Sequence, residues 1–247
     1  MTVVFFIAIT VAVFLTSLLS GIFGMAGGLI LLWILTFLLP IASAIAVHGL
    51  VQMVSNGSRA WMSRAYLDVR TLILLLSGLG TAAGFLAFID YRPSLVVVSV
   101  VIGVMPILVW LPMGRLRLDG QRPIQAFLCG LISGSLSIAI GVSGPTVDLF
   151  FITTRMDRRQ IIATKAAFQL ITHGTKVLFY VDAAAELTVN GWMVVIAAMP
   201  FAIIGTRTGN VILHRMSNER YRTWARWIVT AVGAVYLLRI PFSDFSW

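Results

Sequence analysis

Charged residues are scarce in this sequence, and cysteine is almost absent. Only 11% of the 247 residues are charged, whereas about a quarter of the residues are charged in water-soluble domains. Hydrophobic residues make up 59% of the chain. This composition excludes an ordinary soluble domain and predicts an all-α integral membrane protein. The one cysteine, Cys129, provides neither a disulfide framework nor a cysteine metal site, so we expect no metal and no cofactor.

Acidic residues are also few, with nine against eighteen basic residues and a net charge of +9. Such a balance can indicate nucleic-acid binding, but the basic residues lie in short gaps between apolar runs rather than along a soluble face. We therefore expect a lipid bilayer, and no nucleic acid, as a partner. By the positive-inside rule, four arginine groups mark cytoplasmic loops. These groups are Arg59, Arg64 and Arg70; Arg115, Arg117 and Arg122; Arg155, Arg158 and Arg159; and Arg215, Arg220, Arg222 and Arg226.

The apolar runs predict ten helical segments. They lie near residues 2–20, 28–39, 43–62, 70–89, 94–111, 124–140, 145–154, 160–181, 188–213 and 223–240. A helix needs roughly 20 residues to cross the hydrocarbon core. The runs 28–39 and 145–154 are too short, and each follows a glycine-rich break, so they predict two re-entrant hairpins. The first run lacks the basic start and the cleavage site of a signal peptide, and we expect it to be a retained helix.

The chain also repeats itself at an offset of 117 residues. The matched pairs are Ser20 with Ser137, Gly24 with Gly141, Gly27 with Gly144, Gln52 with Gln169, and Gly57 with Gly174. Residues 1–117 and 118–247 are therefore predicted to be two related transmembrane repeats of one membrane domain. The basic loops place the ends of the first hairpin outside and the ends of the second inside. We expect inverted repeats, each with a glycine-broken hairpin and three transmembrane helices.

Glycines recur on two later helices. After a further shift of eight residues, Gly80 and Gly84 match Gly205 and Gly209. Small residues allow membrane helices to approach closely, so we interpret these four glycines as packing residues.

Two polar stripes follow the hairpins. His48, Gln52, Ser55, Asn56 and Arg59 share an arc of about 100° on one helix, and the second half repeats this pattern with Lys165, Gln169, Thr172, His173 and Lys176. Charge at the bilayer centre costs about 2.5 to 3.5 kcal/mol per residue on translocon scales, so these groups need partners, water or substrate. The two stripes predict one shared polar interior. Two alternatives stay open: Arg59 and Lys176 snorkel to the interface, and the glutamines only join helices.

The hairpin breaks provide a complementary feature. Residues 24–28 and 141–145 each end where a helix begins, and Pro145 suits a first helical turn. Free backbone N–H groups and the helix dipole favour an anion there, although close packing through glycine is an alternative. We expect the anion between the two hairpin tips. The candidate contacts are Gly27, Gly28, Ser143, Gly144 and Thr146 from the breaks, and Gln52, Asn56, Arg59, Gln169, His173 and Lys176 from the stripes.

Asp148 is the one acidic residue inside an apolar run. It can cap its helix, pair with Lys165 or Lys176, or carry a proton that is coupled to transport. Histidine titrates near neutral pH. Asp148, His173 and Lys165 are therefore the candidates for proton coupling, and a structural ion pair is an equally open reading of Asp148.

These motifs resemble the TauE/SafE family, which is also called the sulfite exporter or toluene sulfonate uptake permease (TSUP) family. The resemblance rests on Gly24 to Gly28, on Gly141-Val142-Ser143-Gly144-Pro145, and on residues 164–169 with His173, Lys176, Phe179 and Tyr180. It covers essentially the whole chain. It implies a secondary transporter rather than an enzyme, moving sulfite, an organosulfonate such as sulfoacetate, or a similar sulfur-containing anion. It also implies a location in the bacterial inner membrane and protons as a candidate coupling ion.

Two other functions compete with transport. Gly141-Val142-Ser143-Gly144 matches the Gly-x-Ser-Gly sequence of rhomboid proteases, with His173 as a possible base. However, the 30 residues between Ser143 and His173 are fewer than rhomboids usually have, and Ala26 and Asn56 replace the pair in the first half. A protease also has no need of two cationic stripes. The other competitor is a membrane assembly factor without transport activity, in which changes to the stripes would be tolerated.

Overall fold

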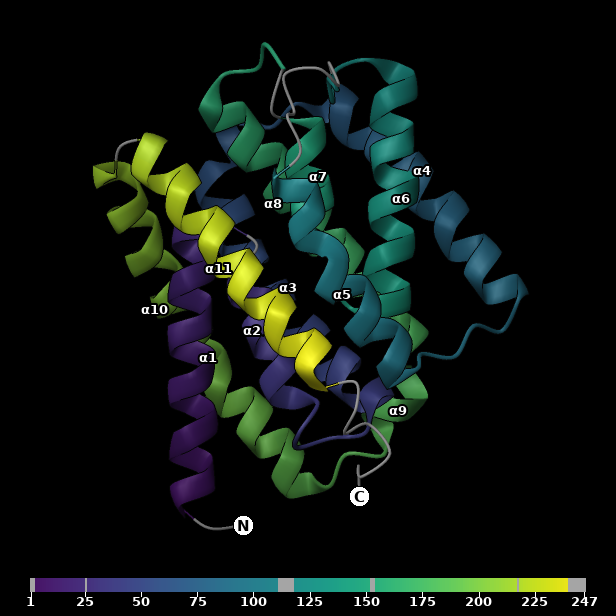
Figure 1. Cartoon of the computed structure of the whole chain (residues 1–247), viewed down its shortest axis with the longest axis vertical. Helices are drawn as coiled ribbons and strands as arrows, with labels where there is room; N and C mark the ends of the chain where they lie inside the picture. The colour runs from purple at the N-terminus through teal and green to yellow at the C-terminus, as the bar shows by residue number, and fades with distance from the viewer. Residues whose placement is uncertain (1–2, 25, 111–117, 152–153, 217, 240–247) are drawn as a thin grey trace.

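The computed structural model is helical throughout the residues it describes, which are 3–24, 26–110, 118–151, 154–216 and 218–239 (Figure 1). No strand occurs in those segments. The expectation of an all-α protein is confirmed. Arg115 and Arg117, which were named from the sequence, and Met25 of the first glycine break lie outside the described residues.

In the first half, the described residues form five α-helices and a short 3₁₀ turn, which are α1 (Val3–Phe23), α2 (Ala26–Leu35), α3 (Ile41–Ser63), η1 (Arg64–Tyr66), α4 (Val69–Phe88) and α5 (Leu95–Trp110). The second half contains α6 (Pro123–Ile140), α7 (Gly144–Phe150), α8 (Arg158–Phe179), α9 (Val181–Ala185), α10 (Val189–Arg215) and α11 (Asn218–Arg239). All ten expected segments are present. The short elements η1 and α9 were not expected, and α11 begins five residues earlier than the sequence indicated.

Among the residues that the structure describes, four helices are long and apolar enough to cross a membrane. They contain the segments Phe6–Phe23, Val69–Phe88, Pro123–Ile140 and Gly191–Leu213. α3 and α8 have 23 and 22 residues and are long enough to span, but they carry the two polar stripes and are not among these four. The multipass membrane character is confirmed. The polar side chains that make α3 and α8 less apolar than these four helices are those of the candidate site.

Both glycine breaks occur where the sequence placed them. α1 ends at Phe23 before Gly24, and α6 ends at Ile140 before Gly141. The φ angles of Gly24 and Gly141 are +76° and +87°, a region that glycine occupies without the steric cost paid by other residues. After each break the chain turns back, so that α2 packs on α1 and α7 packs on α6. Pro145 lies in the first turn of α7, as expected.

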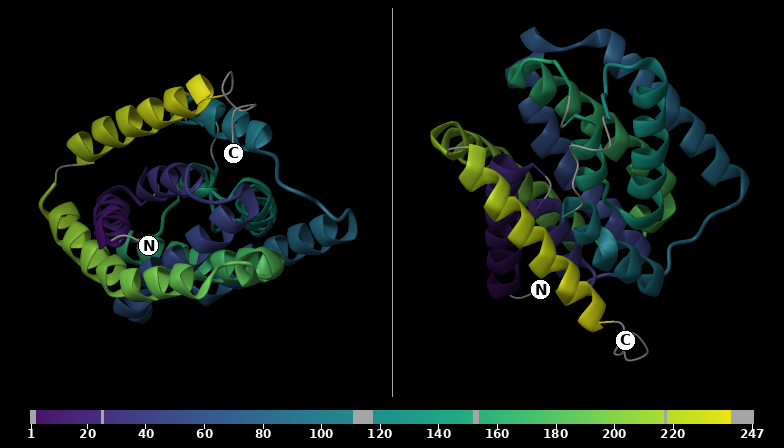
Figure 2. Two further views of the ribbon diagram at one scale, coloured as in Figure 1. Left: turned by 90° about the horizontal axis from the view of Figure 1, so that it is seen from below. Right: turned by 45° about the horizontal axis from the view of Figure 1, so that its top comes forward.

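The main helix contacts join the two halves of the chain. α1 packs on α10, α4 on α6, α3 on α8, and α5 on α11. Figure 2 shows α5 and α11 together along one side of the molecule. Each of these pairs takes one helix from residues 1–117 and one from residues 118–247. The two halves are therefore interleaved rather than placed side by side as separate bodies.

Glycine packing explains two of the four helix glycines named above. A Cβ atom on Gly209 would meet the carbonyl group of Leu18, and one on Gly205 would lie 2.5 Å from the carbonyl oxygen of Phe14, so both glycines allow α10 to touch α1. For Gly80 and Gly84 the expectation is wrong, because nothing lies within 4 Å of the position of a Cβ atom on either residue.

The glycines that bring α4 and α6 together are Gly78 and Gly130. A Cβ atom on Gly78 would meet the carbonyl group of Phe127, and one on Gly130 would meet that of Leu75. Gly80 is two residues beyond Gly78, which rotates it about 200° around the helix, away from the contact face. The sequence match between Gly80 and Gly205 therefore did not identify the packing face of α4.

Buried apolar side chains form two main clusters that fix the central helices. One cluster contains Leu29, Leu32, Ile45 and Tyr236 and joins α2, α3 and α11. The other contains Leu75, Ile138 and Phe168 and joins α4, α6 and α8. Each cluster therefore includes a hairpin helix and a helix that carries a polar stripe, so packing holds each stripe against a hairpin.

Candidate functional site

The two polar stripes are buried inside the protein. On α3, the exposed fractions of His48, Gln52, Asn56 and Arg59 are 1, 4, 3 and 8%, and Lys176 on α8 is fully buried. Gln169 and His173 are buried as well. Arg59 and Lys176 therefore do not extend to the membrane interface, because both side chains form hydrogen bonds with partners inside the protein.

α3 binds the first hairpin at two points. Nε2 of His48 lies 3.0 Å from the carbonyl oxygen of Gly28, near the start of α2. Three turns further along α3, Nη2 of Arg59 donates to the carbonyl oxygen of Ser20 at 2.7 Å, in the last turn of α1. One central helix thus holds both arms of the hairpin in its own half.

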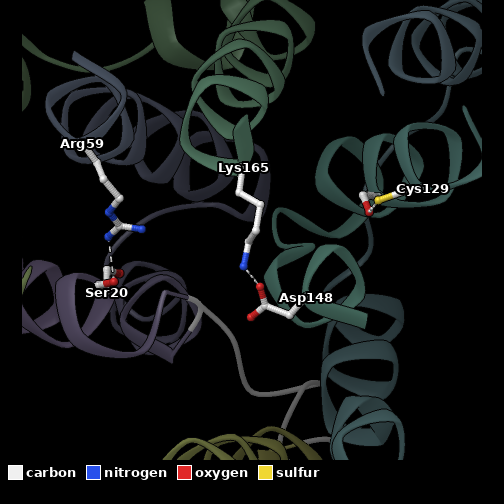
Figure 3. Close-up of polar contacts among 6 residues, drawn as sticks. Ser20, Arg59, Cys129, Asp148 and Lys165 are labelled. Atoms are coloured by element: carbon white, nitrogen blue, oxygen red, sulfur yellow. Dashed lines mark hydrogen bonds and ion pairs between the residues drawn. The ribbon is translucent and has the colours of Figure 1, made fainter. Parts of the chain in front are cut away.

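α8 binds the second hairpin in the same way. Nζ of Lys176 donates to the carbonyl oxygen of Gly141 at 2.8 Å, where α6 ends. Lys165, three turns earlier, forms an ion pair with Asp148 of α7. Figure 3 shows Arg59 directed at Ser20 and Lys165 directed at Asp148. Of the partners considered for Asp148, the structure selects Lys165 and not Lys176.

These bonds pair the backbone carbonyl groups that a broken helix would otherwise leave without a partner in a membrane interior. Carbonyl groups at the end of a helix have no partner within the helix, and leaving them unpaired away from water costs several kcal/mol each. The tyrosines contribute here too. The hydroxyl of Tyr180 donates to the carbonyl oxygen of Ile138 at 2.8 Å, and that of Tyr91 donates to the carbonyl oxygen of Ala139 at 3.1 Å. The carboxyl end of α6 is therefore closed by side chains.

The two halves meet at a contact between α3 and α8. Nζ of Lys176 lies 2.7 Å from Nδ1 of His48, and the rings of His48 and His173 meet edge to face with centroids 5.7 Å apart. His48 belongs to the predicted stripe but was not among the candidate site residues. Its spacing of four residues before Gln52, which matches Lys165 before Gln169, was the available signal.

Several buried polar atoms of the two stripes and of α7 have no hydrogen-bond partner among the described residues. Within the described residues, Nε2 of Gln52, Oγ1 of Thr146 and Nδ1 of His173 make no hydrogen bond. The amide oxygen of Gln52 accepts from Nδ2 of Asn56 at 3.4 Å, which leaves its amide nitrogen directed elsewhere. Because buried polar groups are nearly always paired, atoms of this kind indicate where a ligand or water binds.

The two adjacent glycines at the start of α2 have different surroundings. A Cβ atom on Gly28 would lie 3.3 Å from Nε2 of both Gln52 and His48, so Gly28 faces the polar interior. A Cβ atom on Gly27 would meet the carbonyl group of Thr16 and the side chain of Ser20, so Gly27 faces α1. Close packing therefore accounts for Gly27.

The remaining candidates lie around the second break. Ser143 is buried and precedes α7 without capping it through its side chain, and Gly144 is partly buried at the first position of α7. Thr146 is buried in the first turn. Ser55, a member of the α3 stripe, bonds Oγ1 of Thr206 at 2.7 Å and so joins α3 to α10.

Positive charge exceeds negative charge among these groups. Arg59, Lys165 and Lys176 are three basic side chains, and Asp148 is the one acidic side chain of the set. Lys176 is fully buried, and its bonds go to a histidine ring and a backbone carbonyl, which are uncharged acceptors. A buried cation without a carboxylate partner is costly, and an anion in contact with it lowers that cost.

The structure gives no support to the serine protease. No hydrogen bond between Ser143 and His173 occurs in the described segments, and Nδ1 of His173 has no partner there. A nucleophilic dyad depends on that contact. The same segments contain no group of three histidine, cysteine or acidic side chains that is suited to a metal ion.

The apolar helices, the glycine-broken hairpins and the cationic interior define a multipass integral membrane protein. The family model for sulfite exporter TauE/SafE matches residues 9–236, which is nearly the whole chain. The chain belongs to the sulfite exporter TauE/SafE family, which is a family of membrane transporters, and the resemblance read from the motifs is confirmed. Comparison with curated proteins and with solved structures gave no match.

Proposed function

We propose that the protein is a secondary transporter that carries a small sulfur-containing anion, such as sulfite or an organosulfonate like sulfoacetate, across the bacterial inner membrane. The observation that carries the proposal is Lys176, a fully buried basic side chain whose hydrogen-bond partners, His48 and the carbonyl group of Gly141, are uncharged acceptors. Family membership supports the class of substrate. The buried basic side chain supports a negatively charged substrate.

The anion site is formed by donors from both halves. Sulfite and sulfonate groups present three oxygen acceptors, which match amide, hydroxyl and ammonium donors that approach from different helices. Gln52 of α3, Thr146 of α7 and His173 of α8 have buried atoms free to bind. Lys176 supplies charge between them, and Asn56 and Gln169 complete the site as buried amides. Hydrogen bonds to an ionised oxygen are the strong ones.

We further propose that residues 1–117 and 118–247 are inverted repeats. The helix contacts support this, because exchanging the halves converts the α1–α10 contact into the α6–α4 contact and the α2–α11 contact into the α7–α5 contact, and both members of each exchange occur. α1 also starts at the end of the molecule opposite to that at which α6 starts (Figure 1). Inverted repeats with a site between them are a common basis for alternating access.

The interleaved contacts indicate which helices move together when access alternates. Because α1 packs on α10 and α4 packs on α6 through glycines, these pairs are each held together. The movement that alternates access therefore occurs between two units that each combine both halves. One contains α1, α2 and α10, and the other contains α4, α6 and α7.

The test is anion flux into proteoliposomes that contain the purified protein. Sulfite, thiosulfate, sulfoacetate, sulfolactate and oxalate are compared, with Lys176→Ala and Gln169→Ala as site variants. Arg92→Gln is the matched control, because Arg92 is an exposed cation whose salt-bridge partner, Asp90, is exposed as well. We expect flux of at least one sulfur-containing anion, loss of flux in Lys176→Ala, and unchanged flux in Arg92→Gln.

Two outcomes would contradict the proposal. Full flux in both Lys176→Ala and Gln169→Ala would show that the anion binds elsewhere. No flux of any anion, together with a melting temperature that anions do not alter, would favour the non-transporting assembly factor.

A further inference from the structure

The bond between His48 and Lys176 fixes the tautomer of the histidine ring. The carbonyl oxygen of Gly28 can only accept, so Nε2 of His48, 3.0 Å away, carries the ring proton and donates it. In the neutral ring, Nδ1 then has the lone pair that accepts from Nζ of Lys176 at 2.7 Å. The pair holds one positive charge, and both ring nitrogens of His48 are occupied.

A proton that binds Nδ1 of His48 removes this acceptor. The ring becomes a cation next to the ammonium of Lys176, and two unit charges about 4 Å apart repel by roughly 4 kcal/mol at an effective dielectric constant of 20. The bond between α3 and α8 is then lost. Lys176 keeps its bond to the carbonyl oxygen of Gly141 and gains a free N–H for another acceptor.

We propose that the His48–Lys176 pair is the proton-binding site of the transporter, and that a proton enters at Nδ1 of His48 together with the anion. This inference rests on the proposed transport of an anion next to Lys176. An anion supplies the negative charge that a doubly protonated pair needs. Proton and anion each favour the binding of the other, because linkage between two sites is reciprocal.

The pair also connects the moving parts. His48 bonds Gly28 of the first hairpin, and Lys176 bonds Gly141 of the second. One chain of hydrogen bonds therefore runs from one hairpin through both central helices to the other. Opening its middle bond releases the hairpins from each other, which links the proton to the change in access.

Other charged groups around His48 do not replace it in this role. His173 is the second titratable side chain that α8 directs toward the ring, and its Nδ1 has no partner in the described segments. α2 has no titratable side chain. Asp182 of α9, Arg64 of η1 and Arg207 of α10 belong to elements that contact α3, but these side chains are exposed. Asp148, a partly buried carboxylate, is paired with Lys165.

His48→Gln tests the inference directly. A glutamine amide can accept from Lys176 through its oxygen and donate to Gly28 through its nitrogen, but it does not titrate. The probe is radiolabelled sulfoacetate, whose charge is constant around neutral pH. Two modes are measured in proteoliposomes: accumulation driven by an inward proton gradient, and exchange of internal for external anion at equal pH.

We expect wild-type protein to accumulate the anion and His48→Gln to lose this accumulation by about tenfold or more while exchange continues. Asp182→Asn, which removes an exposed titratable side chain of α9, serves as the control and should still accumulate the anion in response to the gradient. His173→Gln is measured beside it as the competing proton site. A pH-sensitive dye inside the vesicles should report proton entry with sulfoacetate for wild type and not for His48→Gln.

The results separate this inference from the proposed function. Gradient-driven accumulation at the wild-type level in His48→Gln would overturn the proton site and leave anion transport standing. Loss of coupling in His173→Gln with coupling retained in His48→Gln would overturn it as well. Absence of all anion flux in the wild type would overturn the proposed function and, with it, the inference.

Discussion

Arg59 and Lys176, which are 117 residues apart, perform the same structural task in the two halves of the chain. Each donates to a backbone carbonyl at the carboxyl end of the first hairpin helix, Arg59 to Ser20 and Lys176 to Gly141. A cation at that position also favours the negative end of the helix dipole. The two stripes are therefore structural and electrostatic at once, since they close the hairpins and bring positive charge to the interior.

Removing the side chain of Arg59 should weaken the first hairpin. Arg59→Ala takes a charged donor away from the carbonyl oxygen of Ser20, and a bond of this kind contributes about 1.5 to 3 kcal/mol. Thermal unfolding in detergent should show a clear loss of stability, and Arg59→Lys should recover part of it because the ammonium can still donate. Equal melting temperatures for wild type and Arg59→Ala would contradict this role.

Substitutions at the Lys165–Asp148 pair can decide whether it is a structural ion pair or a part of proton coupling. Both side chains are about four-fifths buried. Asp148→Ala leaves Lys165 as an uncompensated cation, which should destabilise the protein by about 3 kcal/mol. The double variant Asp148→Asn with Lys165→Gln removes both charges and should recover stability and proton-driven anion accumulation. Recovered stability without accumulation would instead assign the coupled proton to the Asp148–Lys165 pair.

Two glycine-to-alanine substitutions in helices should behave in opposite ways. In Gly130→Ala, the new methyl group would meet the carbonyl group of Leu75 and push α6 from α4, at a cost of about 1 to 3 kcal/mol. In Gly80→Ala, the methyl group enters open space, and alanine favours a helix by up to about 1 kcal/mol over glycine. Melting temperatures of the two variants give the comparison. A larger loss in Gly80→Ala would indicate that its exposed face is an interface.

A cross-link between α5 and α11 should stop transport. Gly103 of α5 packs against Leu237 of α11, and these helices contact different units, α5 with α6 and α7 and α11 with α2. Gly103→Cys with Leu237→Cys, in a Cys129→Ala background, should lose anion flux after oxidation and regain it after reduction. Single-cysteine variants control for the substitutions themselves. Undiminished flux in the oxidised protein would exclude relative movement of the two units at this contact.

Local rules predicted most of the helices and both breaks. Apolar runs bounded by arginine or proline are local signals, and positive φ angles at Gly24 and Gly141 explain why glycine stands at both turns. The packing glycines were harder to predict. Gly78 and Gly80 look alike in the sequence, and only the position of α6 decides which of them is in contact.

The sequence predicted which residues form the two stripes, but it did not predict the contacts that these residues make. Helical spacing placed His48 and Lys176 on polar faces of two helices. It could not indicate that the ammonium of one would lie 2.7 Å from the ring of the other, because their distance depends on how α3 crosses α8. The bond from Arg59 to Ser20 was missed for a similar reason, since a backbone carbonyl acceptor leaves no trace in the amino-acid sequence.

The contact between α1 and α10 has a consequence for how the protein is made. α1 leaves the ribosome well before the glycines against which it packs, Gly205 and Gly209, because these glycines lie in α10. During synthesis α1 must remain in the bilayer without its partner while most of the protein is inserted. The apolar segment Phe6–Phe23 of α1 is uninterrupted, and it is therefore stable in lipid during this time. The contact between α1 and α10 thus forms only after α10 has been inserted, and a chain truncated before α10 would leave this face of α1 uncovered.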